Sequence, residues 1–145
     1  MSSKNAVKNY GLLIERNYRR IKQSYLKTFR GAGVNITTEQ WVILDNLAAK
    51  DGISQNELAE KTFKNAPTLS RIINLMEEKG WLERRRSPSD KRSFLIFLLP
   101  GGQDTHYKLS PLVKNLRKQG WEGLSEEDFA RFREIMQTVY GNFPE

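Results

Sequence analysis

Residues 53–100 constrain the fold of this chain more than any other part of its 145-residue sequence. They contain two amphipathic segments separated by a short turn, followed by two extended runs on either side of a basic loop. Ser54 and Glu57 have the spacing of a capping box, which predicts that the first helix begins at Ser54. Leu58 and Ala59 would form its short buried side. This order of elements predicts a winged helix-turn-helix within a mainly α chain that carries a small β-hairpin wing.

The second amphipathic segment predicts a helix with one buried stripe and one small polar face. Asn65 is a suitable N-cap, and Pro67 is tolerated because the first N–H groups of a helix have no intrahelical partner. The expected buried stripe recurs at three- and four-residue spacing and consists of Leu69, Ile72, Ile73 and Met76. The expected outward face consists of Pro67, Thr68, Ser70, Arg71 and Asn74. Such a face is as typical of an ordinary solvated helix as of a binding surface.

The sequence after Gly80 favours the binding interpretation. Glycine is preferred where a helix ends in the left-handed conformation, so Gly80 predicts the end of the second helix. Trp81 and Leu82 begin an extended run, and residues 94–99 form a dense apolar return strand. The expected loop at residues 84–92 carries five basic residues and one acid, which are Arg84, Arg85, Arg86, Lys91, Arg92 and Asp90. Its local charge of +4, against +7 for the whole chain, predicts concentrated positive charge in a hairpin that contacts DNA phosphates.

Short motifs follow one another in a specific order through this stretch. They are Leu58-Ala59-Glu60, Thr68-Leu69-Ser70-Arg71, Leu75-Met76-Glu77-Glu78-Lys79-Gly80, Glu83-Arg84 and Asp90-Lys91-Arg92. In this order they resemble the MarR family of bacterial winged helix-turn-helix transcriptional regulators. The resemblance implies that Arg92 in the wing reaches DNA and that Asp90 steadies it. The chain departs from the family pattern at residues 99–102, Leu-Pro-Gly-Gly, which predicts a looser or shifted exit from the wing strand.

The resemblance implies a homodimer that binds a pseudo-palindromic operator in double-stranded DNA, as a repressor released by a small-molecule ligand. We treat residues 1–145 as a single MarR-like unit, with the DNA-binding lobe at 36–100 and dimerisation helices at 4–30 and 103–142. The candidate DNA-binding residues are Asn65, Pro67, Thr68, Ser70, Arg71, Arg84, Arg85, Arg86, Asp90, Lys91 and Arg92.

A small aromatic or anionic effector is also implied by the resemblance, bound between the dimer helices and the DNA-binding lobe. Its expected neighbours are Tyr18, Tyr25, Phe29 and Trp41. No convergent set of polar residues in the sequence marks a pocket there. For Trp41 the alternative is a core position, which large aromatic residues on a helix stripe favour.

The segments on either side of the motif predict further helices. Apolar residues recur at helical spacing through residues 5–29, as Val7, Tyr10, Ile14, Tyr18, Ile21, Tyr25 and Phe29. The opposite face is basic, which is typical of a solvated face; a membrane-surface helix is the less favoured alternative. Thr37 and Gln40 predict a capping box before a helix that is lined on one side by Trp41, Leu44, Leu47 and Ala48.

After the wing, two more amphipathic segments are expected. In residues 107–116, Pro111 either begins the regular part of the helix, with Ser110 as its cap, or kinks it. Ser125 and Asp128 then open a last helix with the stripe Phe129, Phe132, Ile135, Met136, Val139 and Tyr140. One winged motif cannot cover the apolar surface of these helices and of the N-terminal helix. We therefore expect a two-fold dimer in which the three terminal helices interlock.

Several function classes are disfavoured by composition. The chain has no Cys and a single His, His106, and it lacks a nucleophile motif or a phosphate-binding glycine loop, so we expect no catalytic site, metal or cofactor. No apolar run approaches the ~20 residues that cross a bilayer, and the first residues lack a signal-peptide core, so a cytoplasmic protein is expected. One alternative stays open, a winged-helix module that binds protein or RNA without operator-specific DNA binding.

Overall fold

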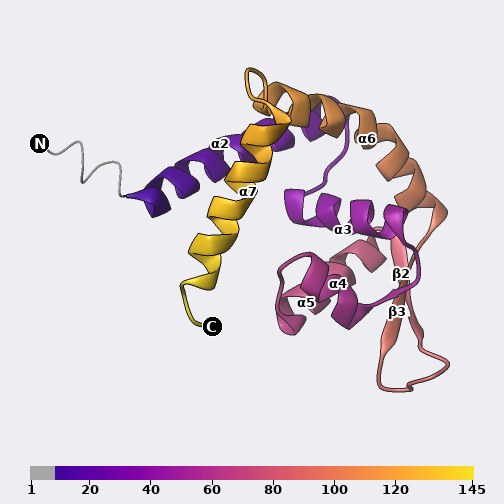
Figure 1. Ribbon diagram of the computed structural model, residues 1–145. Helices are drawn as coiled ribbons and strands as arrows, with labels where there is room; N and C mark the ends of the chain where they lie inside the picture. Colours follow the sequence, from indigo (N-terminus) through magenta and orange to yellow (C-terminus); the bar gives the residue numbers. More distant parts are fainter. Residues whose placement is uncertain (1–8) are drawn as a thin grey trace, which may run out of the picture.

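The computed structural model describes residues 9–145 as helices and a three-stranded antiparallel sheet. The elements follow in the order α2 (Tyr10–Gly31), α3 (Thr38–Ala49), β1 (Ile53–Ser54), α4 (Gln55–Lys61), α5 (Ala66–Glu78), β2 (Leu82–Arg86), β3 (Phe94–Leu98), α6 (Pro100–Gly120) and α7 (Glu126–Gly141). Figure 1 shows a lobe made of α3, α4, α5 and the sheet, and an arm made of α2, α7 and the far end of α6. The predicted mainly α fold, with a winged helix-turn-helix between flanking helices, is confirmed.

The core lies around α3, which contacts α2, α4, α5, β3 and α6. Trp41, Leu44 and Leu47 are buried, as predicted. Ile43 is buried as well, whereas Ala48 is exposed, so the expected one-sided stripe is wrong in these two positions. The reason is that neighbouring elements cover α3 on more than one side. The predicted α5 stripe is confirmed, with Leu69, Ile72, Ile73 and Met76 all buried.

The predicted starts of α3, α4, α5 and α7 are confirmed, but one cap differs from its prediction. Complete capping boxes open α3 and α7. At α4, Ser54 Oγ accepts a hydrogen bond from the backbone N–H of Glu57 at 3.1 Å. The Glu57 carboxylate, however, lies 3.4 Å from Lys50 Nζ and 3.8 Å from Lys61 Nζ. It therefore pairs with these lysines and does not reach back to the N-cap, so the expected reciprocal bond is not formed.

The sheet has the order β1-β3-β2, and both strand pairs are antiparallel. The β2–β3 ladder continues as far as Arg86, which pairs with Phe94. The three consecutive arginines from Arg84 onward therefore lie in a strand, and the prediction of a loop beginning at residue 84 is wrong. The loop covers residues 87–93, because the apolar β3 strand supplies a hydrogen-bonding partner along the whole of β2.

The exit from the wing is tight, so the expectation of a loose exit is wrong. α6 begins at Pro100, directly after the N-cap residue Leu99, and not at residue 103. A Cβ atom added to Gly102 would lie 2.0 Å from the carbonyl oxygen of Trp81. The first turn of α6 thus packs on the backbone at the start of β2, where only glycine leaves enough space.

Pro111 lies inside α6 and does not begin it, which resolves the open alternative. Because proline lacks an N–H group, it removes one hydrogen bond of the helix and permits bending. Leu109 and Val113, on either side of it, are both buried. Figure 1 shows α6 curving over α3 from the sheet to the arm.

The helices of the arm keep apolar faces exposed. In the predicted α2 stripe, Phe29 is buried and Tyr25 is half-buried, whereas Tyr10, Ile14, Tyr18 and Ile21 are exposed. Val7 lies outside the described residues. No residue of α7 is buried, and its exposed side chains include Phe129, Phe132, Ile135 and Tyr140. In residues 9–145 we find no helix whose length and apolarity would let it cross a membrane.

Candidate nucleic-acid interface

The N-terminal half of α5 is the centre of the candidate interface. The side chain of Asn65 accepts a hydrogen bond from the backbone N–H of Thr68 at 2.9 Å, which fixes the start of the helix as predicted. Pro67 and Arg71 are exposed, and Thr68 is half-buried. Within residues 9–145, no hydrogen bond or ion pair occupies the Arg71 guanidinium. These side chains are free to meet a ligand that approaches the helix from outside.

Arg84 is turned into the lobe and not toward solvent. Its Nε donates to Gln55 Oε1 at 3.1 Å, and its Nη2 donates to the carbonyl oxygen and Oγ of Ser70 at 3.1 and 3.2 Å. Its Nη1 donates to Asn74 Oδ1 at 2.6 Å and pairs with the Glu77 carboxylate. Only 15% of the Arg84 side chain is exposed. Arg84 therefore ties β2 to α4 and α5. We reassign Arg84 and Ser70 from DNA contacts to positioning residues.

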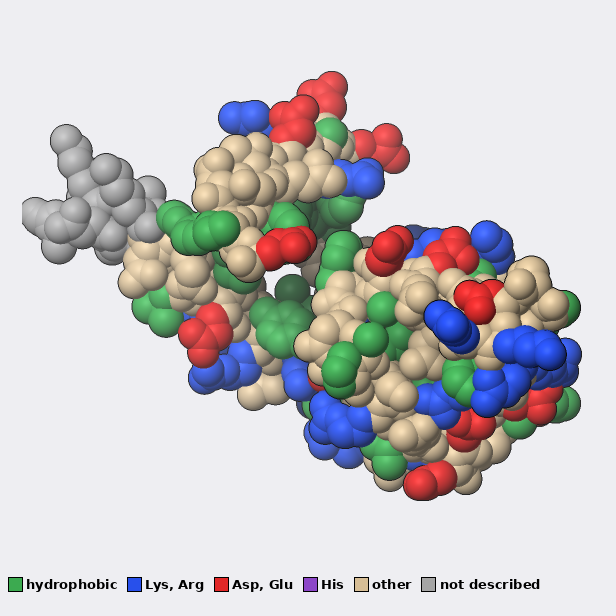
Figure 2. Space-filling model, turned by 90° about the horizontal axis from the view of Figure 1, so that it is seen from below, with side chains coloured by type: hydrophobic (Ala, Val, Ile, Leu, Met, Phe, Trp, Pro, Cys, Tyr) green, Lys and Arg blue, Asp and Glu red, His purple; other side chains and the backbone are tan. Residues whose placement is uncertain are grey.

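The next two arginines lie on the surface of the wing. Arg85 pairs with Glu83, and its guanidinium lies 4.1 Å from the centroid of the Phe97 ring. The Arg86 guanidinium lies 5.2 Å from the centroid of the Phe94 ring and donates to a backbone carbonyl of the wing loop. Stacking on aromatic faces holds both cations close to the sheet while they remain exposed. Figure 2 shows Lys and Arg side chains gathered over the part of the lobe that carries the wing.

Asp90 orders the tip of the wing through the backbone. Its Oδ1 accepts a hydrogen bond from the backbone N–H of Arg92 at 3.0 Å, and its Oδ2 accepts one from Ser93 Oγ at 3.0 Å. The side chains of Lys91 and Arg92 have no hydrogen bond or ion pair among residues 9–145. Asp90 therefore steadies Arg92 through its backbone N–H, and the Arg92 guanidinium has no partner among residues 9–145.

The positive charge of the wing does not extend over the rest of the DNA-binding lobe. Residues 32–99 contain ten Lys or Arg and nine Asp or Glu, whereas α2 contains six and one, and α6 contains four and one. The wing cations act locally, because exposed charges are screened beyond about 10 Å at ordinary ionic strength. An anion that approaches this lobe is therefore attracted by the cations of the wing, and not by a positive charge of the whole lobe.

The four aromatic residues expected near an effector do not surround one cavity. Phe29 and Trp41 are fully buried in the core, with ring centroids 6.1 Å apart, which confirms the core alternative for Trp41. Tyr18 lines a cavity of about 150 Å³ against α3 and the helix-turn-helix turn. Tyr25 lines a separate cavity of about 260 Å³ between α2 and α6. Only the two tyrosines are placed to contact a ligand.

His106 belongs to a cluster that sequence reasoning missed. Its ring stacks on Trp41 with centroids 5.0 Å apart, and its Nε2 lies 2.9 Å from Asp45 Oδ1. Arg117 pairs with the same carboxylate at 3.5 Å. The cluster joins α3 to α6, and no sequence spacing could reveal it, because Asp45 and His106 are 61 residues apart.

Lys79, near the end of α5, has a structural role. Its Nζ donates to the carbonyl oxygen of Asn35 at 2.5 Å and lies 4.4 Å from the centroid of the Trp81 ring. Burial lowers the pKa of Lys79, because desolvation disfavours its charged form. These contacts tie the end of α5 to the segment before α3.

Replacement of Arg84 should show whether this residue acts through its hydrogen bonds within the lobe or only through its positive charge. Arg84→Ala should lower the free energy of unfolding by about 2 kcal/mol, because it leaves the half-buried Glu77 carboxylate and Ser70 carbonyl without their donor. Arg84→Lys should recover little of this loss, since an ammonium cannot reproduce the forked geometry of guanidinium. Urea unfolding measures both variants. The matched control is Arg85→Ala on the exposed side of the same strand; an equal loss in this control would contradict the positioning role of Arg84.

Comparison with known proteins agrees with this geometry. A model of the MarR family matches residues 33–93, which span the helix-turn-helix and most of the wing. A putative transcriptional regulatory protein for the hcr operon of Thauera aromatica is 28% identical over 126 residues, covering 83% of this chain and 76% of that relative. The transcriptional repressor MprA of Escherichia coli K12 is 26% identical over 113 residues, covering 78% and 64% respectively. The chain is thus similar to MarR-family transcriptional regulators, and the match to the family model is confined to residues 33–93.

Solved structures of MarR-family proteins share the fold. A MarR variant from E. coli, complexed with operator DNA, superposes with a TM-score of 0.80 at 21% identity, covering 96% of this chain and 99% of that chain. PcaV from Streptomyces coelicolor, in complex with its natural ligand, superposes with a TM-score of 0.71 at 22% identity, covering 86% and 89%. The MarR family consists of transcriptional regulators and not of enzymes, as the sequence predicted.

Proposed function

We propose that this MarR-like protein is a repressor that binds a pseudo-palindromic operator in double-stranded DNA as a homodimer. The observation that carries the proposal is the exposed half of α5, which stands beside a wing held to it by Arg84. A helix of this kind enters a major groove, while wing cations contact the phosphates or minor groove alongside. The E. coli relative is named a repressor, which favours repression.

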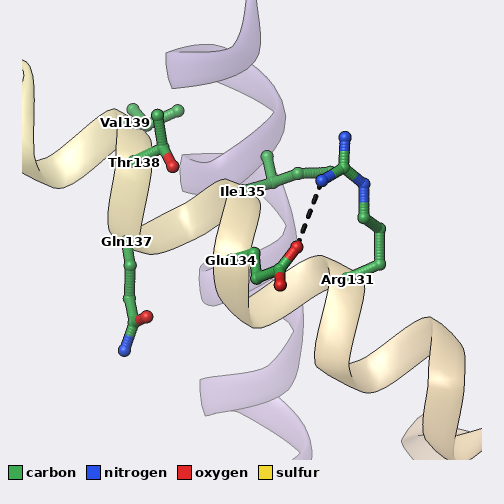
Figure 3. Close-up of a pocket in the computed structure, with 6 residues that line it drawn as sticks. All are labelled: Arg131, Glu134, Ile135, Gln137, Thr138 and Val139. Carbon is green, nitrogen blue, oxygen red and sulfur yellow. Dashed lines mark hydrogen bonds and ion pairs between the residues drawn. The ribbon is translucent and has the colours of Figure 1, made fainter.

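The unpartnered face of α7 supports the homodimer. A hollow of about 620 Å³ is lined by α7 residues alone, so one protomer supplies only one of its walls. Figure 3 shows these lining residues, among them Ile135, Val139 and the ion pair between Arg131 and Glu134. A second copy that packs its own arm here would bury the exposed apolar faces of α2 and α7. Two copies would then place two α5 helices on one face of a duplex.

We further propose that a small aromatic acid releases the repressor from DNA. Tyr25 and Arg20 line the cavity between α2 and α6, which offers an apolar wall and a cation to such a ligand. This cavity lies between the arm helices that would form the dimer. PcaV, which shares the fold, was solved with its natural ligand, which makes ligand control reasonable for this chain.

The first experiment is selection of duplex DNA from random fragments by the purified protein. A gel-shift assay of the enriched duplex at two salt concentrations should then show tight binding that weakens with salt. Enrichment of no sequence, together with salt-insensitive binding, would contradict the proposal. Retention of protein or RNA instead of duplex DNA would favour an interaction module.

Arg71 should read the operator sequence. Arg71→Ala should cost about 1–3 kcal/mol of binding free energy on the selected duplex and much less on random DNA, because a bidentate contact to guanine is sequence-specific. Titration of both duplexes by fluorescence anisotropy measures the difference. Equal losses on the two duplexes would make Arg71 a phosphate contact and would remove the reading role from this position.

Substitutions in the wing should distinguish the effect of the Arg92 charge from the effect of the Asp90 hydrogen bond that orders the loop. Arg92→Ala should weaken binding to every duplex and lower the salt slope by roughly one per half-site. Asp90→Ala should also weaken binding, although it removes a negative charge, because it releases the Arg92 backbone. Asp90→Asn is the control, since its amide oxygen can still accept from the Arg92 N–H. Tighter binding by Asp90→Ala than by the unchanged protein would refute this ordering role.

A further inference from the structure

Phe63, in the turn between α4 and α5, is not explained by the fold of one chain. Its side chain is 91% exposed, so it contributes almost nothing to the core. Its φ is +55°, and it is the only non-glycine residue within residues 9–145 that has a positive φ. A bulky side chain is strained in this left-handed region, where glycine or asparagine is preferred.

The backbone of the turn requires the left-handed conformation but not the phenyl ring. The N–H of Phe63 donates to the carbonyl of Glu60 at 3.3 Å, and the N–H of Lys64 donates to the carbonyl of Ala59 at 3.0 Å. This pair of bonds is a Schellman motif with Phe63 at its left-handed position, which glycine usually occupies. Glycine would close the same turn with less strain. Within residues 9–145 the exposed ring therefore adds almost nothing to stability, and contact with an external partner would offset the strain.

The position of Phe63 shows which partner fits. Only Lys64 separates it from Asn65, the cap of α5, and Pro67 follows in the exposed first turn. Figure 1 shows this turn on the same lower side of the lobe as the wing. Lys61 and Lys64 flank it, and each is held only by a carboxylate 3.8 Å away, so their cations can turn toward phosphates. The ring is thus continuous with the surface proposed to face DNA.

We propose that the Phe63 ring packs on the C5-methyl group of a thymine at the edge of the groove that α5 enters. This inference rests on the proposed function and adds a residue that sets sequence preference. In a major groove, pairs that contain thymine present an apolar C5-methyl group, and phenylalanine is among the side chains that contact it. Burial of the ring against DNA would offset the strain of the turn.

The test combines protein variants with DNA that lacks single methyl groups. Phe63→Asn removes the ring and suits the left-handed backbone, whereas Phe63→Leu keeps an apolar side chain. Each thymine of the selected duplex is replaced in turn by deoxyuridine, which differs only in the missing methyl. For the unchanged protein, replacement at one position per half-site should weaken binding about three- to tenfold, in keeping with the loss of one buried methyl contact.

Phe63→Asn should weaken binding to the thymine duplex by a similar factor and show no further loss on the deoxyuridine duplex. The affinity of Phe63→Leu for the thymine duplex should lie between that of Phe63→Asn and that of the unchanged protein. The thermal midpoint of Phe63→Asn should be unchanged or raised, because the strain is relieved. Tyr107→Ala is the control, since Tyr107 is a similarly exposed aromatic residue on α6, and this variant should bind as the unchanged protein does.

The outcomes distinguish the two levels of the proposal. If the unchanged protein selects a duplex but is insensitive to every deoxyuridine, or if Phe63→Asn binds as tightly as the unchanged protein, the thymine contact is overturned and the regulator function stands. If the unchanged protein selects no duplex at all, the proposed function is overturned, and the Phe63 contact with it.

Discussion

Ile135→Glu should convert the protein from a dimer to a monomer of about 16.9 kDa that keeps its helical signal. Ile135 is 47% exposed in the single chain and lies on a helix with no buried residue, so a charge there is tolerated by the protomer. In a dimer the same charge would be buried without a partner, and such burial is costly. Operator affinity should fall by roughly two orders of magnitude, because the two lobes would no longer bind as one linked unit.

Light scattering at micromolar concentration gives the mass, circular dichroism gives the helical content, and a gel-shift assay gives the affinity. The matched control is Ala130→Glu, which introduces the same charge at an exposed position of α7 that does not line the hollow on this helix. A monomeric mass for the unchanged protein, with full helical signal, would refute the dimer. A dimeric Ile135→Glu variant would instead move the interface away from this face.

Gly102→Ala should destabilise the lobe more than any other single-methyl change. The added Cβ would lie 2.0 Å from the Trp81 carbonyl oxygen and 3.1 Å from the side chain of Leu98. Since the nearest atom belongs to the backbone, relief requires α6 to shift away from the start of β2. We expect a loss of about 3 kcal/mol in the free energy of unfolding, at the upper end of the range for overpacking.

Thermal or urea unfolding measures this loss. Gly120→Ala, in the last turn of the same helix, is the control, because nothing lies within 4 Å of a Cβ added there. That variant should be neutral or slightly stabilising, since alanine is the better helix former. Equal stability of the two variants would mean that α6 can move away from the start of β2 without loss. The close approach of Gly102 to the Trp81 backbone would then not hold α6 in place.

The segments that the sequence predicted well are those where local chemistry decides the structure. The capping boxes of α3 and α7, the Asn65 cap and the buried stripe of α5 depend on residues within a few positions of one another. The exposed stripe of α7 and the family motifs are equally local. From them, the winged helix-turn-helix, the flanking helices and the exposed reading half of α5 were predictable before any coordinates.

Residues whose partners are distant in the chain were placed differently by the structure. Arg84 was expected among free wing cations, yet its donors are taken by groups on α4 and α5, up to 29 residues away. The tight start of α6 could not be predicted, because it depends on the distance between Gly102 and the Trp81 backbone. The core position of Phe29 likewise follows from the packing of α2, α3 and α6 against one another, whereas the burial of Trp41 was already favoured by its place on a helix stripe.

The sequence by itself therefore determined which segments are helices and strands, where they are capped, which motif they form and which faces they leave apolar. Periodicity and capping act over one or two helical turns, so a linear pattern contains them completely. Only the tertiary structure decided which cations stay free, which brace the motif and which aromatic rings form the core. Hydrogen-bond and packing partners are chosen by proximity in space: Arg84 contacts Ser70, whereas the Phe63 ring stays 91% exposed among residues 9–145.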